Sequence, residues 1–166
     1  MSGIDPSQLR QRIIVPTLLM LGNALGGAAA EEILLGIALQ ESSGGHWLAQ
    51  IDGPARGIWE MEKATHDDLW KNFLNTRDSL AVRVSALSVP VIDRVEQLAG
   101  NLYYACAMAR IDLLRASEPL PPAGDIAAQA DYYKRHYNSA RGKATVDEYL
   151  ANWRAAFPNS FPPAGA

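Results

Sequence analysis

Residues 31–61, EEILLGIALQESSGGHWLAQIDGPARGIWEM, contain an apolar helix whose core-facing stripe ends in an acid. The i, i+3, i+4 spacing of the apolar residues places them on one helix face, and Glu41 continues the same stripe. Ser42-Ser43-Gly44-Gly45 then predicts the end of the helix, with Glu41 in its last turn. The stripe consists of Ile33, Leu34, Ile37 and Ala38.

The position of Glu41 predicts a raised pKa. The negative end of the helix dipole and the apolar neighbours both disfavour the ionised carboxylate. A carboxylic acid that stays protonated near neutral pH is what a general acid for glycosidic bond cleavage needs. The alternative is a structural glutamate, half solvated, with its stem packed along the stripe. The pattern alone leaves both interpretations open.

Composition predicts one globular domain over residues 1–166, with N-terminal helices in 1–28 and an irregular tail in 158–166. The chain is 48% hydrophobic and 20% charged, which provides a sizeable core. Its net charge of −3 argues against nucleic acid as a partner. The single Cys106 lies in an apolar run and is expected to be a small buried hydrophobe.

Residues 10–30 resemble a signal peptide, because two arginines precede an apolar stretch that ends in small residues. Pro16 and Asn23 interrupt that stretch. Its uninterrupted apolar run of about nine residues is far shorter than the ~20 residues that a membrane span requires. We therefore expect a core helix here, no signal peptide and no membrane span.

The remaining pattern predicts an all-α fold with a substrate groove built from loops. A first helix is expected from Pro6 to Ile14, and Pro16 is expected to open a second one that Gly26-Gly27 closes. A loop rich in Gly, Asp and Pro fills residues 44–59. Further helices are expected over residues 63–74, 78–87, 91–98, 101–116 and 125–137, and from Thr145 onward.

Four segments, in order, resemble the soluble lytic transglycosylases, relatives of goose-type lysozyme that cleave peptidoglycan. LGIALQESSGG is similar to the glutamate-serine motif of that family, and ARGIWEMEKATH to its Gly-Leu-Met-Gln segment. GNLYYACAMARI is similar to the helix that follows, and KRHYNSARG to the Ala-Tyr-Asn-Ala-Gly segment. GIWEMEKATHDD and KRHYN resemble bacteriophage and prophage members in particular.

The resemblance implies a lysozyme-like fold and a lytic transglycosylase. Glu41 would be the general acid and then the base on the β-1,4 bond between N-acetylmuramic acid and N-acetylglucosamine. The substrate's own acetamide would assist, and a 1,6-anhydro product would form without a cofactor or metal. Peptidoglycan glycan strands would be the partner. The substrate-binding residues would be Ser42, Gly57, Ile58, Trp59, Glu60, Met61, Tyr137 and Asn138.

Individual roles follow from the same resemblance. Tyr137 is expected to hydrogen-bond near Glu41 or the acetamide, and Trp59 is the foremost candidate for stacking on a sugar, followed by Trp47 and Tyr103. Ser42 either supports the reaction intermediate or caps the helix. The three histidines share no metal-ligand spacing, so no metal site is expected.

Glu60 departs from the family, which usually has Gln there. A second carboxylate at Glu60 or Asp52 could activate water, which would make the protein a hydrolytic muramidase. A rival interpretation is a virion structural or ejection protein that keeps the fold with little or no catalysis. It predicts Glu60 in a salt bridge with Arg56 or with the neighbours of Glu41. Either protein would belong to a virion or an infected cell, beside other virion proteins, and the enzyme would act at the periplasmic cell wall. The missing signal disfavours a host periplasmic enzyme.

Overall fold

The computed structural model describes residues 3–138 and 142–158. This part of the chain is mostly helical, and its extended pairings are two isolated bridges, Ala49–Arg56 and Arg56–Met61. The all-α class expected from the sequence is therefore confirmed. The α-helices of the described residues are α1 (Pro6–Leu9), α2 (Val15–Leu21), α3 (Ala28–Ser42), α4 (Lys63–Asp68), α5 (Asp78–Ser85), α6 (Gln97–Gly100), α7 (Leu102–Leu114), α8 (Ile126–His136) and α9 (Val146–Ala156).

The first helical run differs from its prediction. α1, a π-helical turn over Arg10–Ile14 and α2 follow one another directly, so the expected break at Pro16 is wrong. Pro16 cannot donate a backbone hydrogen bond, and the wider π turn just before it accommodates the ring without ending the helix. The run ends at Leu21 rather than before Gly26, because Gly22 has a φ of 110° and turns the chain.

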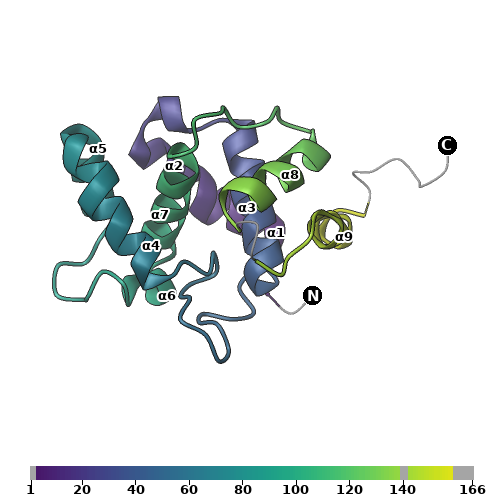
Figure 1. Cartoon of the computed structure of the whole chain (residues 1–166), viewed down its shortest axis with the longest axis horizontal. Coiled ribbons are helices and arrows are strands. Elements are labelled where there is room, and N and C mark those ends of the chain that lie inside the picture. The colour runs from purple at the N-terminus through teal and green to yellow at the C-terminus, as the bar shows by residue number, and fades with distance from the viewer. Residues whose placement is uncertain (1–2, 139–141, 159–166) are drawn as a thin grey trace.

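Two apolar helices, α3 and α7, form the middle of the molecule (Figure 1). The predicted stripe of α3 is fully buried, and most of α7 is buried around its whole circumference. α9 approaches α3 so closely that a Cβ at Gly36 would lie 1.8 Å from the hydroxyl oxygen of Tyr149. Cys106 is buried in α7 as expected, and this burial raises the pKa of its thiol to about 12.

The segment between α5 and α6 also differs from its prediction. Residues 91–98 were expected to be helical, but α6 begins only at Gln97, so this prediction is wrong for most of its length. The Asp93 carboxylate accepts hydrogen bonds from the amides of Val95 and Glu96 and so favours a turn. The Gln97 side chain bonds both backbone groups of Val89, which fixes the preceding loop.

The C-terminal helices begin where the sequence predicts. Asp125 caps α8 by accepting from the amide of Ala128, and Thr145 and Glu148 form the expected capping box of α9. Residues 115–125 form the connector between α7 and α8, which runs along one edge of the molecule in Figure 1. The predicted irregular tail at 158–166 lies outside the described residues except for Pro158.

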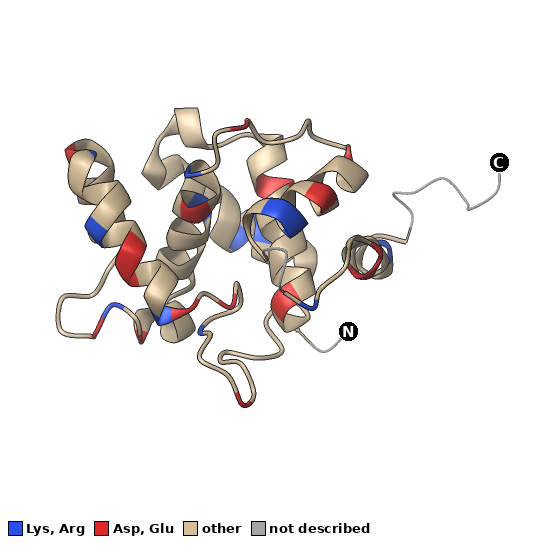
Figure 2. Ribbon diagram, viewed as in Figure 1, with Lys and Arg blue, Asp and Glu red and all other residues tan. Residues whose placement is uncertain are grey.

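Charged residues are interspersed over the helices and loops in the view of Figure 2, and neither sign collects on one element. Within the described residues, no helix is long and apolar enough to cross a membrane. The loop over residues 43–62 lies at the C-terminal end of α3, beside α4 and α6 (Figure 1). This loop and the end of α8 supply most of the candidate site.

Candidate active site

Glu41 lies in the last turn of α3, as predicted. Ser43 adopts the left-handed conformation, with a φ of 51°, and ends the helix. The amide of Gly44 then donates to the carbonyl of Ala38 at 2.9 Å, which closes the last turn. The Glu41 side chain is thereby held, partly buried, at the rim of the core.

Tyr133, in α8, donates a hydrogen bond of 2.6 Å to Oε1 of Glu41. Burial is the largest influence on Glu41 and raises its pKa, while hydrogen bonds from Tyr133 and Asn138 oppose this rise; the net direction is upward. Burial and the adjacent Glu41 charge also raise the pKa of Tyr133, so its phenol stays protonated and acts as the donor. This donor occupies Oε1 and leaves Oε2 to carry the carboxyl proton.

Tyr137 does not hydrogen-bond Glu41, and its alternative expected role, a contact with the acetamide, stays a prediction. Its hydroxyl donates to the backbone carbonyl of Trp59 at 2.8 Å, and Tyr133, one helical turn earlier, holds Glu41 instead. The two rings lie nearly parallel with centroids 6.2 Å apart. The prediction that a tyrosine supports Glu41 identified the right helix face but the wrong turn.

Asn138 connects the end of α8 to Glu41. Lys134 donates to Oδ1 of Asn138 at 2.9 Å and to the carbonyl of Gly142 at 2.7 Å. An ammonium group can only donate, so Lys134 fixes the side-chain amide with its nitrogen free to donate. That nitrogen is the second donor that stabilises the Glu41 carboxylate.

Glu60 sits on a tight hairpin beside α3. Arg56 and Met61 exchange two backbone hydrogen bonds of 2.9 and 3.0 Å, and Gly57 and Glu60 close the turn between them with a third of 3.0 Å. Glu60 has a φ of 45°, a left-handed conformation that is rare for residues other than glycine and concentrates at functional sites. Burial, followed by the nearby charge of Glu41, raises the pKa of Glu60 to about 7.

Two buried hydrogen bonds fasten this hairpin to α3. The Ser42 hydroxyl donates to the carbonyl of Ile58 at 2.8 Å and accepts from the amide of Gly45 at 2.8 Å. The indole of Trp59 donates to the carbonyl of Leu34 at 2.9 Å. Of the two roles considered for Ser42, the geometry therefore favours the structural one.

The candidate active site is an open groove of about 590 Å³. Glu41, Glu60, Met61, Tyr137 and Asn138, all expected from the sequence, line it together. Ser42, Gly57, Ile58 and Trp59 do not: they are buried beneath it. The remaining lining residues are Gln50, Ala55, Glu62, Thr65, Asp112, Gly142, Lys143 and Ala144.

Two further expectations about the groove are wrong. The Trp59 ring is only 1% exposed, so it has no face on which a sugar could stack. Asp52 is exposed on the loop with a φ of 57° and does not line the groove, so of the two expected second carboxylates only Glu60 lies there. Trp47 and Tyr103 are both exposed, but neither lines the groove, and Tyr103 lines a separate apolar cavity beside α6.

Sequence reasoning missed Tyr133 and Asp112. Asp112 is mostly buried in α7 beside the groove, and burial raises its pKa despite an ion pair of 2.5 Å with Arg115. The i, i+4 spacing of Tyr133 and Tyr137 was the available signal for Tyr133, because both phenols then lie on one helix face. Asp112 gave no such signal, since it stands in a nearly continuous apolar run.

Within the described residues, Glu60 forms no salt bridge of the kind expected for a blocked groove. Arg56 donates to the carbonyls of Gly53 and Ala55, and it forms no ion pair with Glu60 in the described part of the chain. No cation among the described residues therefore offsets the burial and the nearby Glu41 charge, which together raise the pKa of Glu60 to about 7. Three carboxyl groups with raised pKa values, Glu41, Glu60 and Asp112, consequently line one groove.

The histidines are separated in the structure. His66 is buried, and Tyr104 and Asp67 bond its two ring nitrogens. His136, at the end of α8, bonds Glu118 of the connector between α7 and α8. Among residues 3–138 and 142–158, no group of three or more His, Cys, Asp or Glu side chains could hold a metal ion.

The arrangement can transfer a proton to a ligand in the groove and take one back. Glu41 provides a carboxyl group whose proton is favoured by burial and whose orientation is fixed by Tyr133. Comparison with known proteins finds no matching family model, no matching curated protein and no matching solved structure.

Proposed function

We propose that this chain is a lytic transglycosylase with a lysozyme-like fold that cleaves the glycan strands of peptidoglycan at the bond between N-acetylmuramic acid and N-acetylglucosamine. The observation that supports this most directly is Glu41, which has a raised pKa, a phenol donor on Oε1 and a position in an open groove. The four motif segments that suggested the family include both Glu41 and Asn138. The same motifs support a phage-encoded protein that is carried in the virion.

The proposed reaction uses Glu41 twice. Its Oε2 proton is transferred to the glycosidic oxygen as the bond to C1 breaks, while the substrate's acetamide oxygen bonds to C1 and balances the developing charge. The Glu41 carboxylate then removes the proton from the 6-hydroxyl, whose oxygen displaces the acetamide and closes a 1,6-anhydro ring. Glu41 ends protonated, and no water is consumed. Tyr133 and Asn138 stabilise the carboxylate between the two steps.

Mass spectrometry of peptidoglycan digested by the purified protein tests the proposal. We expect muropeptides that end in 1,6-anhydro-N-acetylmuramic acid, which have the mass of the hydrolysed product less one water. Reducing ends alone would replace the proposal by a hydrolytic muramidase. No release from permeable, purified peptidoglycan would favour the rival, a virion structural protein.

Hydrolysis is the second candidate because Glu60 shares the groove and has a pKa of about 7, which leaves a substantial fraction of it available as a base near neutral pH. Under transglycosylation, Glu60→Gln should retain the anhydro product. If the protein is instead a hydrolase that uses Glu60 as a base, Glu60→Gln should form much less of the reducing-end product. Glu62→Gln, which removes another carboxylate from the same groove, is the matched control.

Glu60→Gln should also change how stability depends on pH. The folded pKa of about 7 lies above the ordinary value of 4.5, so the folded protein binds more protons than the unfolded chain between these two values. Glu60 therefore reduces stability progressively as the pH rises from 4.5 to 7. Urea unfolding should show wild type losing stability relative to Glu60→Gln over this window. If the stabilities of the two proteins changed in parallel with pH, the raised pKa of Glu60 would be contradicted.

Tyr133→Phe should shift the pH profile of the reaction. The substitution removes a donor that stabilises the Glu41 carboxylate, so the pKa of Glu41 should rise further and the alkaline limb of kcat/KM should move to higher pH. The lost orientation should lower the maximal rate about tenfold, the equivalent of one charge-assisted hydrogen bond.

Tyr149→Phe is the matched control for Tyr133→Phe. The Tyr149 ring packs against Tyr133 with centroids 5.3 Å apart, and its buried hydroxyl has no hydrogen-bond partner among the described residues. Its removal should leave both the rate and the pH profile unchanged. A profile that moves equally in both variants would indicate a packing effect rather than a hydrogen bond to Glu41.

A further inference from the structure

A second cavity, of about 290 Å³, lies between the start of α3 and the C-terminal end of α7, away from the groove. Arg110, in α7, lines it and is 6% exposed. Its Nε donates to the carbonyl of Leu25 at 2.9 Å, and within the described residues this is the one hydrogen bond that the guanidinium makes. The four terminal N–H groups make no hydrogen bond to the described residues, and neither terminal nitrogen is a buried atom without a partner, so both are accessible to solvent in the cavity.

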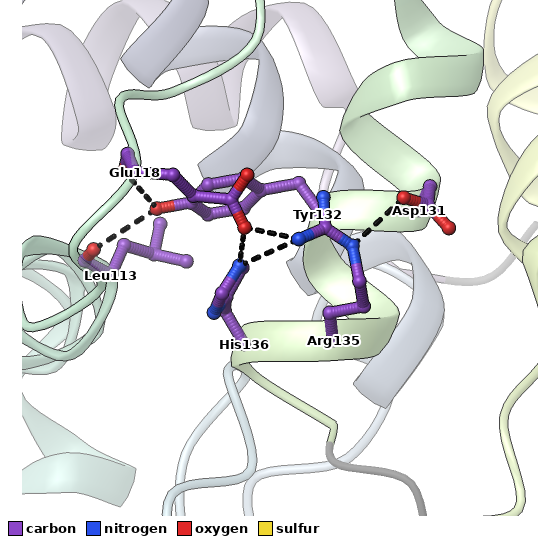
Figure 3. A network of polar contacts seen from close by, with 6 residues as sticks. All are labelled: Leu113, Glu118, Asp131, Tyr132, Arg135 and His136. Atoms are coloured by element: carbon purple, nitrogen blue, oxygen red, sulfur yellow. Dashed lines mark hydrogen bonds and ion pairs between the residues drawn. The ribbon is translucent and has the colours of Figure 1, made fainter.

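Glu118, an acidic residue that also lines this cavity, is paired with residues other than Arg110. Figure 3 shows the Glu118 carboxylate directed at Arg135 and His136 on α8, with the ring of Tyr132 beside it. The hydroxyl of Tyr132 donates to the carbonyls of Leu113 and Glu118. Arg110 itself forms no ion pair in the part of the chain that the structure describes. Its charge is therefore left for a ligand.

The start of α3 provides additional donors at the same cavity. Ala29 and Ala30 line it, and their amides precede the first intrahelical hydrogen bond, which runs from Glu31 to the carbonyl of Gly27. No side chain caps this 15-residue helix. Unsatisfied amides at a helix start and an unpaired guanidinium both favour a bound anion.

We propose that this cavity binds a small organic monocarboxylate, with the carboxylate on the guanidinium of Arg110 and an apolar body against Leu113, Leu114, Pro119 and Leu120. A planar guanidinium fork matches a carboxylate in two parallel hydrogen bonds. One guanidinium balances one negative charge, whereas inorganic phosphate would bring a second charge close to Glu118. The apolar lining selects a ligand that is apolar beyond its carboxylate.

Calorimetric titration of the purified protein with benzoate tests the site, with benzamide as the neutral isostere and inorganic phosphate as the competing anion, all at one ionic strength. We expect binding of benzoate, no measurable binding of benzamide, and weaker binding of phosphate than of benzoate. Arg110→Gln should weaken benzoate binding by at least about tenfold, the effect of losing a charge-assisted contact. Arg83→Gln is the matched control, because Arg83 also donates to a backbone carbonyl, that of Leu21, but does not line the cavity.

Three results would overturn the proposal: no benzoate binding by wild type, equal binding of benzamide, or unchanged affinity in Arg110→Gln. Phosphate binding more tightly than benzoate would overturn the assignment to carboxylates. If Arg110→Gln does not fold, the comparison of benzoate, benzamide and phosphate on wild type decides the question alone. Titration of the Arg110 Nε–H resonance by NMR adds a readout at the residue itself.

Discussion

Replacing Glu41 by Gln should lower muropeptide release by a factor of about 10²–10⁴, the usual contribution of a positioned general acid or base. Gln keeps the shape of the side chain and can still accept the hydrogen bond from Tyr133 at its carbonyl oxygen. It cannot donate an acidic proton to the glycosidic oxygen or remove one from the 6-hydroxyl. Both proposed steps should therefore fail together, and the activity of Glu41→Gln should stay low at every pH.

The loss should not come from misfolding. The pKa of Glu41 is raised in the folded protein, so this carboxyl group binds its proton more tightly there and reduces stability as the pH rises above its ordinary value of 4.5. Glu41→Gln should therefore be at least as stable as wild type at neutral pH in urea unfolding. Glu62→Gln, at an exposed position of the same groove, should release muropeptides at the wild-type rate. Equal release by Glu41→Gln and wild type would remove Glu41 from the reaction.

Gly57→Ala should destabilise the protein by about 2–5 kcal/mol, which combines the cost of a left-handed alanine with that of overpacking. Gly57 has a φ of 78°, and a Cβ there would lie 2.0 Å from the carbonyl oxygen of Leu98, a backbone atom that cannot rotate away. The hairpin would have to move off α6, and Glu60 would move with it. The measurement is urea unfolding together with muropeptide release.

Gly124→Ala separates the two parts of this cost. Gly124 has a φ of 84° but nothing within 4 Å of its Cβ position, so alanine there should cost only the backbone strain, about 1–2 kcal/mol. Gly100→Ala, with open space and no positive φ, should be close to neutral. A Gly57→Ala protein no less stable than Gly124→Ala would show that the hairpin is not packed against Leu98 as described.

Local patterns predicted the helices well where the ends carry their own signals. Some helix ends depend only on residues within one turn of them, so the sequence alone predicts where they fall. Examples are the starts capped by Asp125 and Thr145 and the end set by the Ser-Gly run after Glu41. The helix break predicted at Pro16 is wrong because a π turn just before the proline keeps the helix intact. That turn is stabilised by packing around Ile14, which is fully buried, and packing is invisible in a local pattern.

The candidate site was predictable as a set of segments but not in its detail. The resemblance of four segments to the transglycosylases implied one groove with Glu41, Glu60 and Asn138, and all three residues line it. It could not decide which of Tyr133 and Tyr137 reaches Glu41, because both lie on one face of α8 and their separation along the helix axis selects the partner. Nor could it show that Trp59 faces inward, since that depends on whether the Leu34 carbonyl lies within reach of the indole.

The two bonds that fasten the hairpin to α3 also determine how the groove can respond to a ligand. Because Ser42 bonds Ile58 and Trp59 bonds Leu34, the hairpin that carries Glu60 is fastened to the helix that carries Glu41. Under the proposed function, an entering glycan strand would therefore meet carboxyl groups already in place, and little conformational entropy would be lost in ordering them. The backbone amides of Gly45 and Met61 should therefore exchange with solvent slowly and at similar rates, because both would become exposed only when α3 itself unfolds.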